Sequence, residues 1–134
     1  MSGEMQTARQ WVAKAANDLL CADNNLRADE VPLDTVCFHC QQAVEKLLKA
    51  CLAANGQLPS RTHDLLALLE SVLAFHPGAE ELRETLALLM PFSVEIRYPD
   101  DGFAPSEADA VEARDAAESV LGWFKAALAP LWDN

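Results

Sequence analysis

The stretch that most constrains this chain runs from Val36 to Leu52 and has the apolar spacing of a packed helix. Apolar residues recur there at intervals of three and four, which is the pattern of a helix with one buried face. These apolar positions are Val36, Cys40, Ala43, Val44, Leu47, Leu48, Cys51 and Leu52. Most of the polar residues fall on the other side, at His39, Gln42, Glu45, Lys46 and Lys49.

Other segments have the same helical period, and none has a convincing strand pattern. The chain has 134 residues, 51% of them hydrophobic, which predicts a single domain, residues 1–134, with one core. We expect an all-α, up-and-down antiparallel helical bundle of four long helices plus one shorter helix, the third. The expected helices cover about residues 5–26, 34–54, 62–75, 79–97 and 106–129.

Several residues mark the ends of these helices. Gly56 after Asn55 indicates a helix end, because glycine tolerates the left-handed conformation of a C-cap. Thr62 is the expected N-cap of the third helix, with Asp64 at the positive end of its dipole. Residues 106–109 resemble a capping box, and Pro91 predicts a kink in the fourth helix.

The chain is acidic, with 21 Asp and Glu against 10 Lys and Arg, giving a net charge of −11. This balance argues against broad binding to the backbones of DNA or RNA, which depends on clustered Lys and Arg. A small basic site, or one completed by a partner subunit, stays open. The N-terminus lacks the apolar core of a signal peptide, and no run is as long as a membrane span. We therefore expect a cytoplasmic protein without membrane contact.

The four cysteines include a CxxC spacing at Cys37 and Cys40. Structural zinc takes four ligands, and neither Cys21 nor Cys51 has a matching spacing. We interpret the cysteines as reduced, mostly buried thiols, and expect no metal and no cofactor.

Five fragments, taken in order, are similar to a known family. They are Trp11, then Asp18-Leu19, then Phe38-His39-Cys40-Gln41-Gln42-Ala43-Val44-Glu45-Lys46, then His63-Asp64-Leu65, and then Arg97-Tyr98-Pro99-Asp100. In this order and spacing the chain resembles the HEPN family, the higher-eukaryote and prokaryote nucleotide-binding domains. The resemblance covers nearly the whole sequence.

The resemblance implies a five-helix, mostly up-and-down bundle that commonly forms homodimers. Prokaryotic members are often encoded beside a minimal nucleotidyltransferase, as toxin–antitoxin modules or as halves of a nucleotide-transferring assembly. The domain is also similar to the helical substrate-binding part of antibiotic nucleotidyltransferases. Many members are metal-independent ribonucleases whose active site is an Arg, four to six residues and then a His, paired across the dimer.

This sequence departs from the ribonuclease motif. Arg97 aligns with the family's Arg, but residues 98–108 contain no His, and His63 follows Arg61 too closely. We therefore predict a non-catalytic nucleotide-binding and interaction module that dimerises and works with a separate nucleotidyltransferase. No catalytic residue is assigned, except Arg97 under the first alternative, a ribonuclease with an atypical site that acts on RNA. The other alternative is a structural helper without a ligand.

The candidate binding residues lie on three segments. His39, Gln42, Glu45 and Lys46 share roughly one helix face and form a candidate wall of a nucleotide cleft, with Lys46 near phosphate. The alternative for this face is a solvated or interface surface.

The other candidates flank the third and fourth helices. His63 and Asp64 open the third helix, where free N–H groups can bind an anion, although capping alone explains both residues. Arg97 suits phosphate recognition with Tyr98 beside it, and its alternative is a pair with Asp100 or Asp101. The expected ligand is ATP or another nucleotide.

Overall fold

The computed structural model describes residues 2–93 and 104–132, and this part of the chain is helical without a strand. Three helices are long: α1 (Gly3–Leu26), α2 (Leu33–Ala54) and α5 (Glu107–Ala127). The shorter ones are α3 (Leu65–Leu73), α4 (Arg83–Leu89) and α6 (Ala129–Trp132), with 3-10 turns η1 (Pro77–Leu82) and η2 (Met90–Phe92). The predicted all-α helical bundle is confirmed.

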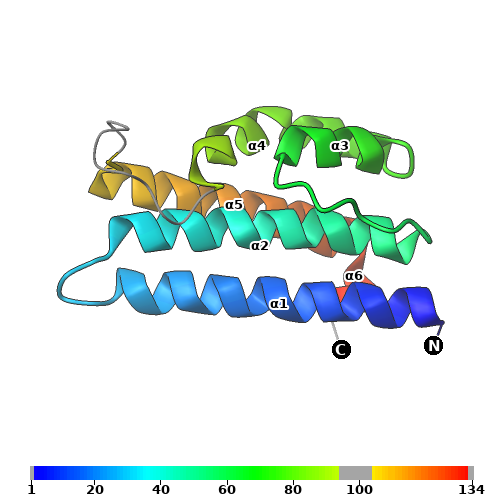
Figure 1. The fold of residues 1–134 in the computed structure, drawn as a ribbon, viewed down its shortest axis with the longest axis horizontal. Coiled ribbons are helices and arrows are strands. Elements are labelled where there is room, and N and C mark those ends of the chain that lie inside the picture. Colours follow the sequence, from blue (N-terminus) through cyan, green and yellow to red (C-terminus); the bar gives the residue numbers. More distant parts are fainter. Residues whose placement is uncertain (1, 94–103, 133–134) are drawn as a thin grey trace.

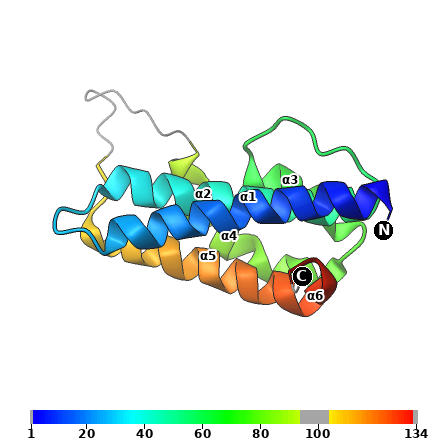
Figure 2. The ribbon, with the colours of Figure 1, turned by 90° about the horizontal axis from the view of Figure 1, so that it is seen from below.

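Helix α2 occupies the centre of the bundle and packs against α1, α3 and α5 (Figures 1 and 2). Helices α1 and α2 are antiparallel and are joined by a short loop. The segment of residues 55–64, here called the strap, then leads the chain back along the C-terminal half of α2 to the start of α3 (Figure 1). Because the strap leads back along α2, α3 runs parallel to α2. Helix α4 then runs in the opposite direction, and α5 is again parallel to α2 (Figure 1).

The helix ends follow local side-chain chemistry. Gly56 adopts the left-handed conformation with φ of 77°, as the predicted helix stop requires. The N-cap of α3 is Asp64 and not Thr62, because the Asp64 carboxylate accepts bonds from the backbone N–H groups of Leu66 and Ala67. The predicted capping box at residues 106–109 is present at the start of α5.

The fourth helix is shorter than the spacing predicts. Its start, at Pro77–Leu82, is a 3-10 helix, and regular α-helix covers only Arg83–Leu89. Pro91 lies in a second 3-10 turn, because proline has no N–H to continue an α-helical ladder. The described residues therefore hold three long helices instead of four, and the expected segment 94–97 lies outside them.

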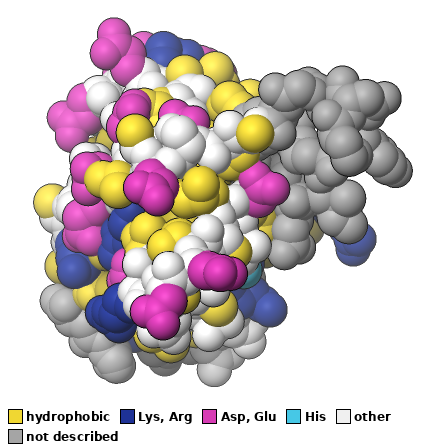
Figure 3. Space-filling view, turned by 90° about the vertical axis from the view of Figure 1, so that its left-hand side faces the viewer, with side chains coloured by type: hydrophobic (Ala, Val, Ile, Leu, Met, Phe, Trp, Pro, Cys, Tyr) yellow, Lys and Arg dark blue, Asp and Glu magenta, His cyan; other side chains and the backbone are white. Residues whose placement is uncertain are grey.

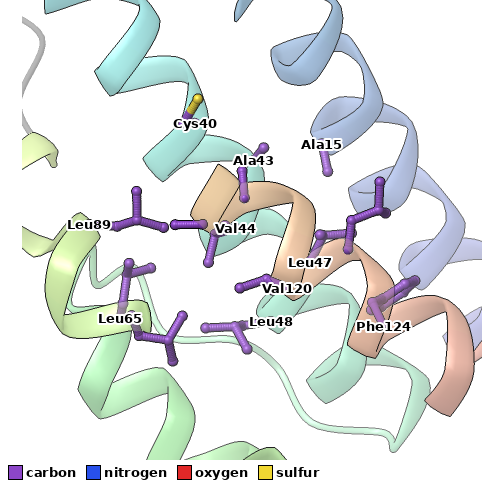
Figure 4. Packing of buried hydrophobic residues seen from close by; sticks show 14 of the residues in the cluster. Ala15, Cys40, Ala43, Val44, Leu47, Leu48, Leu65, Leu89, Val120 and Phe124 are labelled. Atoms are coloured by element: carbon purple, nitrogen blue, oxygen red, sulfur yellow. The ribbon is translucent and has the colours of Figure 1, made fainter. Parts of the chain in front are cut away.

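The core is built around the apolar stripe that the sequence predicts. All eight of its positions are buried, and the largest fully buried side chains come from α2, α3, α4 and α5. Leu48 of α2 meets Leu65 of α3 and Val120 of α5, while Leu47 lies toward α1 and Phe124 (Figure 4). Burying these side chains together stabilises the bundle and fixes the position of α2 relative to its neighbours.

The surface reflects the acidic composition. Asp and Glu side chains are spread over the end of the bundle that carries the α1–α2 loop, with apolar and a few basic groups between them (Figure 3). Within the described residues, no helix has the length and apolar content needed to cross a membrane.

Truncating one core leucine tests this packing. Leu48→Ala removes a side chain that is fully buried, and we expect a loss of about 2–5 kcal/mol in the free energy of unfolding. Leu58→Ala is the matched control, because Leu58 is 95% exposed and its truncation changes stability by less than about 0.5 kcal/mol. Urea unfolding followed by circular dichroism measures both. Equal stability of the two variants would contradict the proposed core.

Candidate functional site

The buried polar residues of the described chain gather at one place. Asp18, Gln41, Glu45 and Lys49 are each at most 6% exposed, and they lie where α1 and the strap cover α2. We call this region, the contact of α2 with α1 and the strap, the seam. Part of the polar side of α2 is therefore internal, and Glu45 does not belong to a solvated face, whereas His39, Gln42 and Lys46 are only partly buried.

The first cluster in the seam is centred on Asp18 of α1. One carboxylate oxygen lies 2.8 Å from His39 Nδ1, and the other accepts a hydrogen bond from Lys46 Nζ at 2.5 Å. Both partners project from α2, so this cluster joins the two helices. The side chains of His39 and Lys46 stay about one-fifth exposed, at 22% and 21%.

The second cluster is centred on Glu45 of α2. Its carboxylate lies 3.0 Å from His63 Nδ1 and accepts a hydrogen bond from Lys49 Nζ at 2.9 Å. Because a carboxylate can only accept, Nδ1 of His63 carries the proton and Nε2 is the free ring nitrogen when the ring is neutral. The His63 side chain is 64% exposed, so this free nitrogen is on the accessible side of a buried ion pair.

Two glutamines complete the network and fasten the strap. Gln42 Nε2 donates to Gln41 Oε1 at 2.7 Å, and Gln41 Nε2 donates both to Glu45 Oε1 and to the His63 carbonyl at 3.3 Å. His63 is thus held by its side chain and by its backbone. A network in which every buried charge has a partner is rigid, and it leaves few arrangements open to the strap.

A pocket opens directly beside the second cluster. It has a volume of about 490 Å³ and lies between α1, the C-terminal part of α2 and the strap. Its lining residues are Trp11, Lys49, Pro59, Ser60, Arg61 and His63. Lys49 Nζ lies 5.4 Å from the centroid of the Trp11 ring, a cation–π contact that places a charge and an aromatic face side by side.

The pocket carries positive charge although the protein is acidic. The charge of Lys49 offsets that of Glu45, whereas Arg61 is exposed and makes no ion pair with any residue that the structure describes. His63 adds a further positive charge when it is protonated. Such a site favours an anionic ligand with a planar group, since the Trp11 ring offers a stacking surface.

The structure brings most of the predicted site residues together. His39, Gln42, Glu45 and Lys46 all belong to the seam, and His63 reaches it from the strap. Asp64 is next to His63 but serves as the cap of α3, so its carboxylate occupies two of the N–H groups that an anion would need. Arg97 and Tyr98 lie outside the described residues.

Sequence reasoning missed part of the pocket. In the sequence Trp11 stands out only as part of the family resemblance, and Arg61 only as a residue too close to His63 for the ribonuclease motif. Neither local pattern nor spacing identifies them, because the strap must fold back over α2 before Arg61 and Trp11 line the same cavity. The i, i+4, i+8 spacing of Gln41, Glu45 and Lys49 was a usable sign, since it aligns three polar groups on one helix stripe.

All four cysteines are free thiols in the described structure, and Cys37, Cys40 and Cys51 are buried while Cys21 is partly buried. Burial raises the pKa of the Cys37 thiol to about 11 and that of Cys40 to about 12. Both groups are therefore neutral thiols at physiological pH, which disfavours metal binding and nucleophilic chemistry. No cluster of three or more metal-ligating side chains occurs among the residues that the structure describes.

The Glu45–Lys49 pair has a testable energetic signature. Glu45→Met leaves Lys49 buried without its counter-charge, and we expect a loss of about 3–5 kcal/mol in the free energy of unfolding. The double variant Glu45→Met/Lys49→Met removes both charges, so it should be more stable than Glu45→Met alone. Chemical denaturation of four proteins, the wild type, Glu45→Met, Lys49→Met and the double variant, measures the coupling. A double variant as unstable as the sum of its single variants would argue against direct coupling of the two charges.

Comparisons with known proteins agree with this architecture. The model of the HEPN domain matches residues 8–127. Among solved structures, the chain is similar to the crystal structure of TT1696 from Thermus thermophilus, with 31% sequence identity and a TM-score of 0.72. The similarity covers 90% of this chain and 98% of that chain. No curated protein matches the sequence. A family match that includes α1, α2 and α5, together with a neighbour of the same fold, shows that this chain belongs to the HEPN family.

Proposed function

We propose that this protein is a nucleotide-binding and interaction module that acts without complete catalytic machinery of its own. The observation that carries the proposal is the pocket of about 490 Å³ in which Trp11, Arg61 and Lys49 converge. Pockets of this size are typical of small-molecule sites. The ligand's base stacks on Trp11 while its phosphate group contacts Arg61.

The seam supports this assignment because it explains why a buried carboxylate lies beneath an anion site. Glu45 holds both Lys49 and His63 in fixed positions, and these two groups line the pocket. A preorganised cation such as Lys49 binds an anion more tightly than a mobile surface lysine, since less side-chain entropy is lost on binding. The buried charge therefore supports binding geometry as well as the fold.

The proposal includes a homodimer that cooperates with a separate minimal nucleotidyltransferase, with ATP or another nucleotide as the shared ligand. Family membership supports both parts, because family members commonly dimerise and are often encoded beside such transferases. The open side of the pocket also suits a shared ligand. The exposed residues Arg61 and His63 are accessible to a second protein while the ligand is bound.

Replacing Arg61, the unpaired cation of the pocket, tests nucleotide binding. In isothermal titration with AMP and with ATP, we expect Arg61→Ala to weaken binding by about tenfold or more, because a charge-assisted phosphate contact is lost. Arg83→Ala is the matched control, since Arg83 is also exposed but pairs with Glu70 and Glu80 near α3 and α4. Its affinity should equal that of the wild type. No heat of binding at high protein concentration would reject the nucleotide-binding role and favour a structural helper without a ligand.

A second candidate function, a ribonuclease with an atypical active site, has one observation in its favour. Buried Glu45 orients the ring of His63 and leaves Nε2 accessible beside Arg61, which is an arrangement able to accept a proton from a ribose hydroxyl. Under the leading proposal, purified wild-type protein does not cleave RNA. Cleavage that is lost in His63→Ala or in Arg97→Ala would instead establish the enzyme.

A further inference from the structure

The two clusters of the seam have the same composition. Asp18 and Glu45 are each buried, and each carboxylate contacts one histidine Nδ1 and one lysine Nζ. Only the second cluster lines the pocket described above. The first has no role in the proposed nucleotide site, although His39 and Lys46 are partly exposed to solvent.

The spacing on α2 places the two clusters next to each other. Lys46 and Lys49 are three residues apart, so their Cβ atoms are separated by about 5–6 Å along one helix face. Their ammonium groups diverge from there, because Lys46 reaches Asp18 on α1 whereas Lys49 reaches Glu45 on its own helix. Cationic groups therefore lie at two separate positions along the seam.

A further basic residue lies on α1, the helix that carries Asp18. Lys14 of α1 is exposed and lies one turn from Trp11 and one turn from Asp18 on the helix. With Lys46, Lys49 and Arg61 it makes four of the ten basic residues of the chain. Lys46 and Lys49 are paired with Asp18 and Glu45, whereas Lys14 and Arg61 make no ion pair with a described residue, and these two unpaired cations favour an anionic ligand with more than one phosphate group.

We propose that the Asp18–His39–Lys46 cluster is a second anion subsite, so that the ligand spans the seam with two phosphate groups separated by a ribose. This inference rests on the proposed nucleotide-binding function and narrows its ligand to a short oligonucleotide, with a 5′-phosphorylated dinucleotide as the smallest form. One phosphate lies at Arg61 and Lys49, and the next lies at Lys46.

Two features set the length and type of this ligand. Neighbouring phosphates of a nucleoside triphosphate share one oxygen, whereas the phosphates of a dinucleotide are separated by a sugar, which suits two lysines that are bonded to different carboxylates. Beyond Asp18, the seam leads to the α1–α2 loop, where Asp29 and Glu30 are exposed. Their charges outnumber that of the exposed Arg27 in the same loop, so this end of the seam is unfavourable for further phosphates and the site suits a short strand.

Three thymidine ligands test the subsite. Thymidine 5′-monophosphate probes the pocket alone, 5′-phosphorylated dithymidylate probes both subsites, and thymidine triphosphate is the control for extra charge without the ribose spacing. The deoxy dinucleotide lacks a 2′-hydroxyl, so a ribonuclease acting through that group leaves it intact. By isothermal titration we expect the dinucleotide to bind about tenfold more tightly than the monophosphate, and more tightly than the triphosphate.

Variants separate the two subsites. Lys46→Gln keeps donors for Asp18, and it should remove most of the dinucleotide gain while leaving monophosphate affinity within about twofold. Lys14→Gln changes an exposed side chain and leaves the buried network intact, so its expected loss of about threefold for the dinucleotide does not depend on the fold. Lys125→Gln, in the last turn of α5, removes the same charge outside the seam and should change neither the monophosphate nor the dinucleotide affinity. Circular dichroism confirms that each variant is folded.

The outcomes distinguish this inference from the proposed function. If the monophosphate binds but the dinucleotide gains nothing, or if Lys46→Gln and Lys14→Gln both keep the gain, the second subsite is wrong and the single pocket stands. If Lys46→Gln weakens the triphosphate as much as the dinucleotide, the ribose spacing is wrong. If neither ligand binds the wild type, the nucleotide-binding function itself is rejected.

Discussion

The ion pair between Glu45 and Lys49 is the interaction on which the site depends. Both side chains are almost fully buried on the central helix, where an unpaired charge is strongly destabilising. Their pairing makes the interior of the seam electrically neutral, and the second carboxylate oxygen is left for His63. The strap is thereby fixed over the C-terminal half of α2, and the pocket exists because the strap is fixed.

The same arrangement relates stability to function. An apolar replacement of these charges would pack as well or better, since buried ion pairs contribute little net stability. The charged residues have another consequence, which is to fix the positions of Lys49 and His63 beside Trp11. A bundle of this size has enough apolar core elsewhere, around Leu48 and Phe124, to tolerate a costly polar seam. We infer that the seam is retained for its geometry.

The absence of the ribonuclease histidine and the presence of the buried network both favour binding over catalysis. The residues after Arg97 lack the histidine of the family motif, so the acid–base group of that motif is absent at its usual place. The structure instead places two of the three histidines, His39 and His63, and two of the four lysines, Lys46 and Lys49, between α1, α2 and the strap. Two carboxylates there each contact one lysine and one histidine, and these contacts fix the positions of all four side chains.

Local patterns in the sequence determined the helices, their caps and the apolar stripe of α2, because these depend on contacts between residues that are close in the chain. The stop at Gly56 and the capping box at residues 106–109 are examples. The shortened fourth helix was less predictable, since an apolar period continues through Pro91 although its backbone cannot. The face shared by His39, Gln42, Glu45 and Lys46 was also visible from spacing. Only the tertiary structure decided that Glu45 on this face is buried while His39 and Lys46 stay partly exposed, because the sequence does not show how α1 and the strap cover it. The same folding unites Trp11, Lys49 and Arg61 in one pocket, since residues so distant in sequence become neighbours only when the strap returns along α2.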